Sequence, residues 1–107
     1  MFDIPERDWK LLRQLKTVAL ERFCERVLNE AVRIAGTPKA TQHERYLKLY
    51  KFVHEQDRAM AAAFDDHRRS TALPKIAHIH SLGLFTDEEF AQFSEETRNY
   101  ALALESL

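Results

Sequence analysis

The stretch GLFTDEEF, residues 83–90, decides the fold, because it holds the signals of one helix end and of the next helix start. Thr86 and Glu89 have the spacing of a capping box, in which each side chain accepts a hydrogen bond from the backbone N–H of the other residue. Phe85 and Phe90 stand at the two positions of a hydrophobic staple. The glycine that opens the stretch can adopt the left-handed conformation that closes the preceding helix. The stretch therefore predicts a tight corner between two helices.

A long helix is expected near the start of the chain. Apolar residues recur at spacings of three and four from Leu12 to Ile34, with polar residues between them, which is typical of an amphipathic helix. The helix should end near Ala35, because Gly36 closes it and Pro38 prevents its continuation.

A second long helix follows after a short connection. Thr41 and Glu44 form another capping box at its start, and we expect the helix to run to about Arg69. A third, shorter helix should begin at Ser70 or Thr71 and end at the corner. Two long helices with so short a connection form an antiparallel hairpin.

The residues after the corner complete the predicted architecture. A last helix follows the capping box, either in one piece or broken by a new cap at Ser94. With two glycines and three prolines, the chain lacks the turns of a β-sandwich or barrel. We therefore predict a single all-α domain over residues 1–107. A long antiparallel helical hairpin carries a shorter C-terminal helical hairpin, in a four-helix, bundle-like arrangement.

The composition favours a protein of the cytoplasm. No stretch approaches the roughly 18 apolar residues of a membrane span, and the N-terminus lacks the pattern of a signal peptide. The one cysteine, Cys24, cannot form an internal disulfide, which fits a reducing compartment. The net charge of −1, with an excess of acidic residues over 86–107, argues against nucleic acid as a partner.

The shorter helices can cover only part of the long hairpin. Helices of about 30 residues extend for roughly 45 Å, whereas the shorter ones reach roughly 17 and 30 Å. The uncovered half is rich in apolar residues, and a large exposed apolar patch marks an interaction surface. The candidate interface residues are Phe23, Val27, Tyr46, Leu49, Tyr50, Phe52 and Val53. We therefore predict a non-enzymatic interaction or oligomerisation module, whose partner is a second copy of the chain or another helical protein.

A polar cluster is a further candidate site. Asp57 lies in the apolar stripe of the second long helix, and a buried carboxylate needs a donor or an opposite charge. The candidate partners lie in the stretch HRRSTALPKIAHIH at residues 67–80, and they are His67, Arg68, His80 and the hydroxyls of Ser70 and Thr71. The primary interpretation is a buried polar pair that fixes the third helix on the second. The alternative is a small-ligand or metal-binding protein, or a minor enzyme, with a site around Asp57, His67 and His80.

No cofactor, metal ligand or catalytic residue is assigned from the sequence. The spacings Glu-x-x-His and His-x-x-x-His, which place metal ligands on one helix face, do not occur. His78 and His80 lie about 200° apart on a helix and cannot both ligate one ion. The sequence also lacks a Gly-rich phosphate loop and a nucleophile elbow.

Two long stretches carry a resemblance. ERDWKLLRQLKTVALERFCERVL (residues 6–28) and FDDHRRSTALPKIAHIHSLGLFTDEEFAQFS (residues 64–94) resemble a group of small all-helical bacterial proteins of unknown function. The resemblance spans most of the chain and implies a helical fold and a bacterial origin, but no activity, cofactor or catalytic residue. Separately, LGLFTDEEF is similar to the corner of short helical-hairpin domains associated with oligomerisation.

Overall fold

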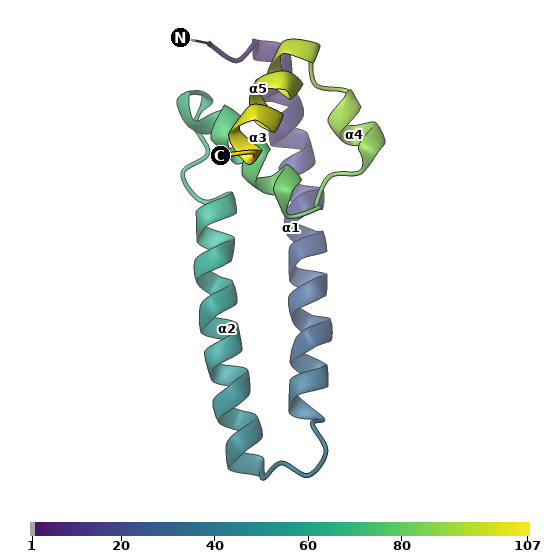
Figure 1. Ribbon diagram of the computed structural model, residues 1–107, viewed down its shortest axis with the longest axis vertical. Helices are drawn as coiled ribbons and strands as arrows, with labels where there is room; N and C mark the ends of the chain where they lie inside the picture. The colour runs from purple at the N-terminus through teal and green to yellow at the C-terminus, as the bar shows by residue number, and fades with distance from the viewer. Residues whose placement is uncertain (1) are drawn as a thin grey trace.

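The computed structural model describes residues 2–107, and the chain is all-α, as predicted (Figure 1). Helices hold 77 % of the residues, and no strand occurs within residues 2–107. The elements in chain order are α1 (Glu6–Ala35), α2 (Gln42–Phe64), the 3₁₀ turn η1 (Arg69–Thr71), α3 (Ala72–Ser81), α4 (Asp87–Ala91) and α5 (Glu95–Glu105). In the same range, no helix combines the length and the apolarity that crossing a membrane requires.

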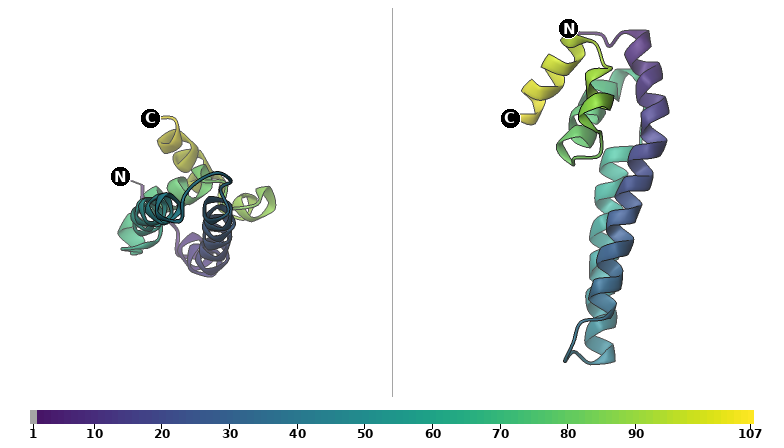
Figure 2. Two further views of the ribbon diagram at one scale, coloured as in Figure 1. Left: turned by 90° about the horizontal axis from the view of Figure 1, so that it is seen from below. Right: turned by 90° about the vertical axis from the view of Figure 1, so that its right-hand side faces the viewer.

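Helices α1 and α2 form the predicted long antiparallel hairpin, which gives the molecule its extents of 53 × 24 × 24 Å (Figure 1). The short helices α3, α4 and α5 gather at the end of the hairpin that is remote from its loop. They lie on one side of the plane of the hairpin (Figure 2). We call residues 24–58 the arm and the rest of the described chain the base. The arm therefore consists of two helices and their loop alone.

The hydrophobic core lies in the base. Leu12 and Ala19 of α1 and Phe64 of α2 meet the short helices there. Their buried partners are Ala72, Ile76, Ile79, Leu84, Phe90, Phe93 and Ala101. Within residues 24–58, only Ile34 is buried to a similar degree. Burial is thus concentrated where the hairpin has a further layer of helices on it.

The first helix ends and the second begins where the sequence predicts. The N–H of Gly36 donates to the carbonyl of Val32 at 3.0 Å, and α1 stops at Ala35. The Thr41 hydroxyl accepts from the N–H of Glu44 at 3.1 Å and so caps α2. The Thr41 side chain is sufficient for the start of α2, whereas Gly36 ends α1 with φ −96° and not in the left-handed conformation expected of a closing glycine.

The predicted end of α2 at Arg69 is wrong, because the helix stops at Phe64. Asp66 adopts the left-handed conformation with φ 56°, which Asp tolerates better than most residues. The Thr71 hydroxyl donates to the Asp66 carbonyl at 2.7 Å and accepts from the Arg68 N–H at 3.0 Å. These bonds give the backbone an alternative to the helix, and apolar periodicity does not reveal them.

The corner at residues 83–90 is confirmed. The Glu89 N–H donates to the Thr86 hydroxyl at 3.1 Å, and the Thr86 N–H donates to the Glu89 carboxylate at 2.8 Å. Phe85 and Phe90 are buried, and both rings pack against Phe93, with centroids 5.8 and 6.2 Å from it. The corner is therefore capped by polar bonds and packed on its apolar side.

The helical segment after the corner is interrupted, which is the second of the two predicted forms. Ser94 is the N-cap of α5 and separates it from the five-residue helix α4. The C-terminal part thus contributes three α-helices to the base, one more than the predicted hairpin of two.

Candidate functional site

The arm carries most of the large apolar side chains that the described chain leaves exposed. They are Leu28, Val32, Tyr46, Leu47, Tyr50 and Val53, with exposed fractions from 46 % to 74 %. We call these six residues the arm surface. Scattered exposed apolar residues are ordinary, whereas a large contiguous apolar patch is typical of interaction sites in general.

The orientation of α1 shows which side of the hairpin the arm surface occupies. Arg26 donates to the carbonyls of Leu82 and Gly83 at 2.6 and 2.8 Å, so this side of α1 faces the corner in the base. Leu28 follows Arg26 by two residues, or about 200° around the helix. Leu28 therefore lies on the side of the hairpin that the short helices leave bare.

On α2 the exposed aromatic residues form one row. Tyr46 and Tyr50 have ring centroids 6.4 Å apart, and the Tyr50 ring lies 4.7 Å from that of His54. Tyr46, Tyr50 and Val53 have the i, i+4, i+7 spacing of a single helical stripe. This stripe turns away from Phe52, which faces Leu82 of the base across a shallow hollow. The two helices thus present their exposed apolar residues on the same bare side.

The predicted interface residues divide into three groups. Phe23 belongs to the core, where its ring meets Phe64 at 6.0 Å, so its assignment to a free surface is corrected. The half-buried residues Val27, Leu49 and Phe52 lie in the seam between α1 and α2. Tyr46, Tyr50 and Val53 are exposed and available for contact.

A bidentate ion pair fastens the corner to α1. Arg22 donates to the Glu89 carboxylate at 2.6 and 3.0 Å and to the Leu84 carbonyl at 2.8 Å. The Arg22 guanidinium holds the pKa of Glu89 below its usual value, and the N–H of Thr86 lowers this pKa further, whereas burial raises it. Sequence reasoning missed this contact, although Arg22 and Arg26 are one helical turn apart and the carbonyls of a corner need donors.

The buried carboxylate of the protein is Asp8, not Asp57. Asp8 is fully buried and accepts from the N–H and hydroxyl of Ser94 at 3.0 and 2.6 Å. It also accepts from the Thr97 hydroxyl at 2.6 Å. A residue in the first turn of α1 therefore fastens the start of α5 to α1. Sequence reasoning missed this role, because an acidic residue in a first turn is ordinarily explained by the helix dipole.

The predicted pair of Asp57 with His80 does not form. Asp57 is exposed, because it lies two helical turns from Tyr50 on the face of α2 that the short helices leave bare. His80 instead places Nδ1 2.8 Å from the Glu105 carboxylate and stacks on Phe90 at 3.8 Å between centroids. The prediction took the face of α2 that carries Asp57 to be covered by the third helix, whereas the structure leaves this face bare.

The other two members of the predicted polar cluster have local partners. His67 Nε2 lies 2.9 Å from the Ala63 carbonyl, and Arg68 forms an exposed ion pair with Asp66. The structure therefore does not assemble Asp57, His67, Arg68 and His80 into one site. Within residues 2–107, no group of three or more His, Cys, Asp or Glu side chains is placed to hold a metal ion.

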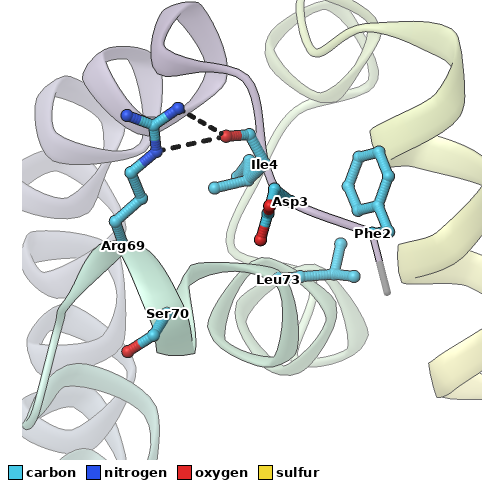
Figure 3. Close-up of a pocket in the computed structure, with 6 residues that line it drawn as sticks. All are labelled: Phe2, Asp3, Ile4, Arg69, Ser70 and Leu73. Atoms are coloured by element: carbon cyan, nitrogen blue, oxygen red, sulfur yellow. Dashed lines mark hydrogen bonds between the residues drawn. The ribbon is translucent and has the colours of Figure 1, made fainter.

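A hollow of about 430 Å³ lies in the base beside the N-terminal segment (Figure 3). Its lining residues are Phe2, Asp3, Ile4, Arg69, Ser70 and Leu73. The Arg69 guanidinium donates twice to the Ile4 carbonyl, at 3.0 and 3.2 Å, and so ties this segment to η1. The lining combines the Asp3 carboxylate and the Ser70 hydroxyl with apolar side chains.

No protein-family model, curated protein or solved structure matches the chain. The arm surface is therefore the feature on which function is inferred.

Proposed function

We propose that the protein is a non-enzymatic helical oligomerisation module whose arm surface binds the arm of a second copy. The observation that carries this proposal is the exposure of six large apolar side chains on an arm that lies outside the packed core. Their burial against a partner would be favourable in proportion to the apolar area removed from water.

The extent of the arm surface suits a dimer. With about 150–250 Å² for each large side chain and the observed exposures, the six residues offer roughly 700 Å² per chain. A stable interface of ordinary size buries about 800 Å² on each partner, including its polar rim.

A second copy is the partner that the geometry favours. Two-fold symmetry places the same surface on both sides of an interface, and closed two-fold dimers are the commonest oligomers. Two antiparallel hairpins packed side by side form a four-helix bundle, in which the seams α1–α2 of each chain supply half of the core. The half-buried seam residue Leu49 would then become fully buried.

The cellular setting that we infer is the cytoplasm. Cys24, the one cysteine of the sequence, is half-buried on α1 and has no internal disulfide partner, which suits a reducing compartment.

The test is the solution mass of a charge variant of the arm surface. Tyr50→Glu combined with Val53→Glu places two carboxylates in the proposed interface, where each would be desolvated without a partner charge. We expect light scattering to give a dimer for the wild type and a helical monomer for the variant.

The matched control is Gln14→Glu combined with Thr17→Glu. These residues are exposed on the base part of α1, and they have the same three-residue spacing and the same change of charge. The control should remain dimeric. A wild-type monomer, or a Tyr50/Val53 variant that assembles like the wild type, would contradict the proposal.

A further inference from the structure

The joint between α2 and η1 has an unusual backbone. Asp65 follows the end of α2 in an extended conformation, and Asp66 then takes the left-handed conformation with φ 56°. The Thr71 hydroxyl closes the turn through its bond to the Asp66 carbonyl at 2.7 Å. The joint connects the long hairpin to the first of the short helices.

His67 is seated inside this joint. Its Nε2 lies 2.9 Å from the Ala63 carbonyl, and a carbonyl can only accept, so Nε2 carries the hydrogen. Its ring is parallel to that of Phe64 at 6.4 Å between centroids, and Phe64 in turn meets Phe23. The packing around the His67 ring is thus continuous with the core of the base.

The other ring nitrogen of His67, Nδ1, has a different environment from Nε2. Nδ1 is buried, and no hydrogen-bond partner for it exists among residues 2–107. In the neutral ring this atom is a bare acceptor, and in the charged ring it becomes an N–H donor. The closed joint therefore offers no acceptor for the proton of an imidazolium.

The charges around the ring come from three elements. Lys16 on α1 and Lys75 on α3 lie near it, and Asp65 and Asp66 lie in its own segment. Burial chiefly lowers the pKa of His67, and the two lysines lower this pKa further, whereas the bond to Ala63 and the charge of Asp65 raise it. The balance favours the neutral ring in the closed joint.

We propose that the α2–η1 joint is an acid-operated hinge, in which a proton on Nδ1 of His67 releases the ring from its seat and lets the end of α2 part from the base. The proton comes from solvent, and opening breaks hydrogen bonds of the joint but no covalent bond. In the open joint water solvates both ring nitrogens, so the charged ring is accommodated there and not in the closed joint.

The direction of the pH effect follows from this difference. An exposed histidine has a pKa of about 6.5, and the closed joint holds the ring below that value. The open state therefore binds more protons, and the closed joint loses stability as the pH falls below about 6.5. With one proton involved, the population of the open joint should rise about tenfold for each pH unit, until the closed form also becomes protonated.

The test is amide hydrogen exchange of the whole chain between neutral and mildly acidic pH. The reporters are the N–H groups of Asp65 and Thr71, which bond to the carbonyls of Ala61 and Arg68 in the closed joint. Their protection, corrected for the intrinsic pH dependence of exchange, should fall about tenfold per pH unit below about pH 6.5. Protection that stays constant over this range would overturn the hinge.

Two variants isolate the histidine. His67→Gln keeps an N–H donor for the Ala63 carbonyl but cannot titrate, so its joint should show no such pH dependence. His43→Gln, the same change at an exposed position near the start of α2, should behave like the wild type. A pH dependence that persists in His67→Gln would overturn the proposal.

Ring nitrogen spectra of the wild type provide a measurement that does not depend on the variants folding. They should show the neutral His67 ring with its hydrogen on Nε2 and a titration below the ordinary range. A hydrogen on Nδ1, or a titration at or above about pH 6.5, would also overturn the proposal.

Discussion

The base and the arm are built from the same two long helices and differ in what lies against them. In the base, α1 and α2 are covered by α3, α4 and α5, and apolar residues such as Leu12, Ile76 and Phe93 are almost completely buried. In the arm the two helices pack mainly on each other, with contacts to the base only near it, such as those of Arg26, and Leu28 and Tyr46 remain more than half exposed. The difference shows that apolar periodicity identifies a helix, whereas the burial of the apolar residues depends on which other elements pack against that helix.

The two regions also differ in how polar groups are used. Base carboxylates and guanidinia such as Asp8, Glu89 and Arg22 are engaged in bonds between distant segments. The arm pairs, such as Lys51 with Glu55, are local and exposed. Each of the following substitutions in the base therefore has a counterpart in the arm that should cost less.

The largest effect is expected for an aromatic residue. Phe93→Ala removes a ring that is 1 % exposed, and should lower the free energy of unfolding by about 3–5 kcal/mol, because it leaves a cavity in the core. Tyr50→Ala in the arm should change this free energy by less than about 0.5 kcal/mol at concentrations where the chain is monomeric. Urea denaturation of both variants measures the difference, and equal costs would remove the distinction between base and arm.

The two aspartates come next. Asp8→Ala should cost about 2–4 kcal/mol, because it leaves the buried donors of Ser94 and Thr97 without an acceptor. Asp57→Ala should stay within about 0.5 kcal/mol, since the carboxylate is already in water. Urea denaturation of both variants measures these costs. A larger cost for Asp57→Ala than for Asp8→Ala would mean that Asp57 is the buried carboxylate.

The ion pairs of α1 are expected to differ less. Arg22→Ala should cost about 1–3 kcal/mol near neutral pH, since it removes a bidentate bond to Glu89 and a bond to a corner carbonyl. Arg33→Ala breaks an exposed pair with Glu30 and should leave the unfolding midpoint unchanged.

The pH dependence of the Arg22 pair has a definite sign. Arg22 lowers the pKa of Glu89 in the folded chain, so the pair stabilises the fold above the ordinary glutamate pKa and loses this effect as the pH falls through the lowered value. The gap in stability between wild type and Arg22→Ala should therefore narrow in acid. A gap that widens as the pH falls would contradict the assignment.

The smallest effect is expected for the two glycines. Gly83→Ala should cost about 1–2 kcal/mol, because φ is +70° at the corner. Gly36 has φ −96°, and an added Cβ would make only an ordinary contact with the Val32 carbonyl at 3.4 Å, so Gly36→Ala should be neutral or slightly stabilising. Thermal unfolding midpoints measure both, and a larger loss at Gly36 than at Gly83 would contradict this ordering.

The parts of the fold that the sequence predicts are those that depend on neighbouring residues. The capping boxes of Thr41 and Thr86 need partners only three residues away, and both helix starts are where the pattern indicates. The end of α2 is not predictable in this way, because the conformation of Asp66 is coupled to the bonds of Thr71.

The same distinction between local and long-range determinants applies to the residues of the candidate site. The exposure of Tyr46, Tyr50 and Val53 agrees with the prediction from periodicity and helix length, because these residues lie on the side of the hairpin that the short helices leave bare. The predicted burial of Asp57 is wrong and the burial of Asp8 is not foreseen, since the burial of each depends on helices far away in the sequence. Periodicity places a side chain on a face of its own helix, but long-range packing decides what covers that face.

The most direct test of the central claim is the mass of the unmodified chain in solution over a wide range of concentrations. If the arm surface binds a second copy, the average mass should rise from the 12.6 kDa of one chain and level off at twice that value. A mass that stays at 12.6 kDa up to millimolar protein would contradict the account.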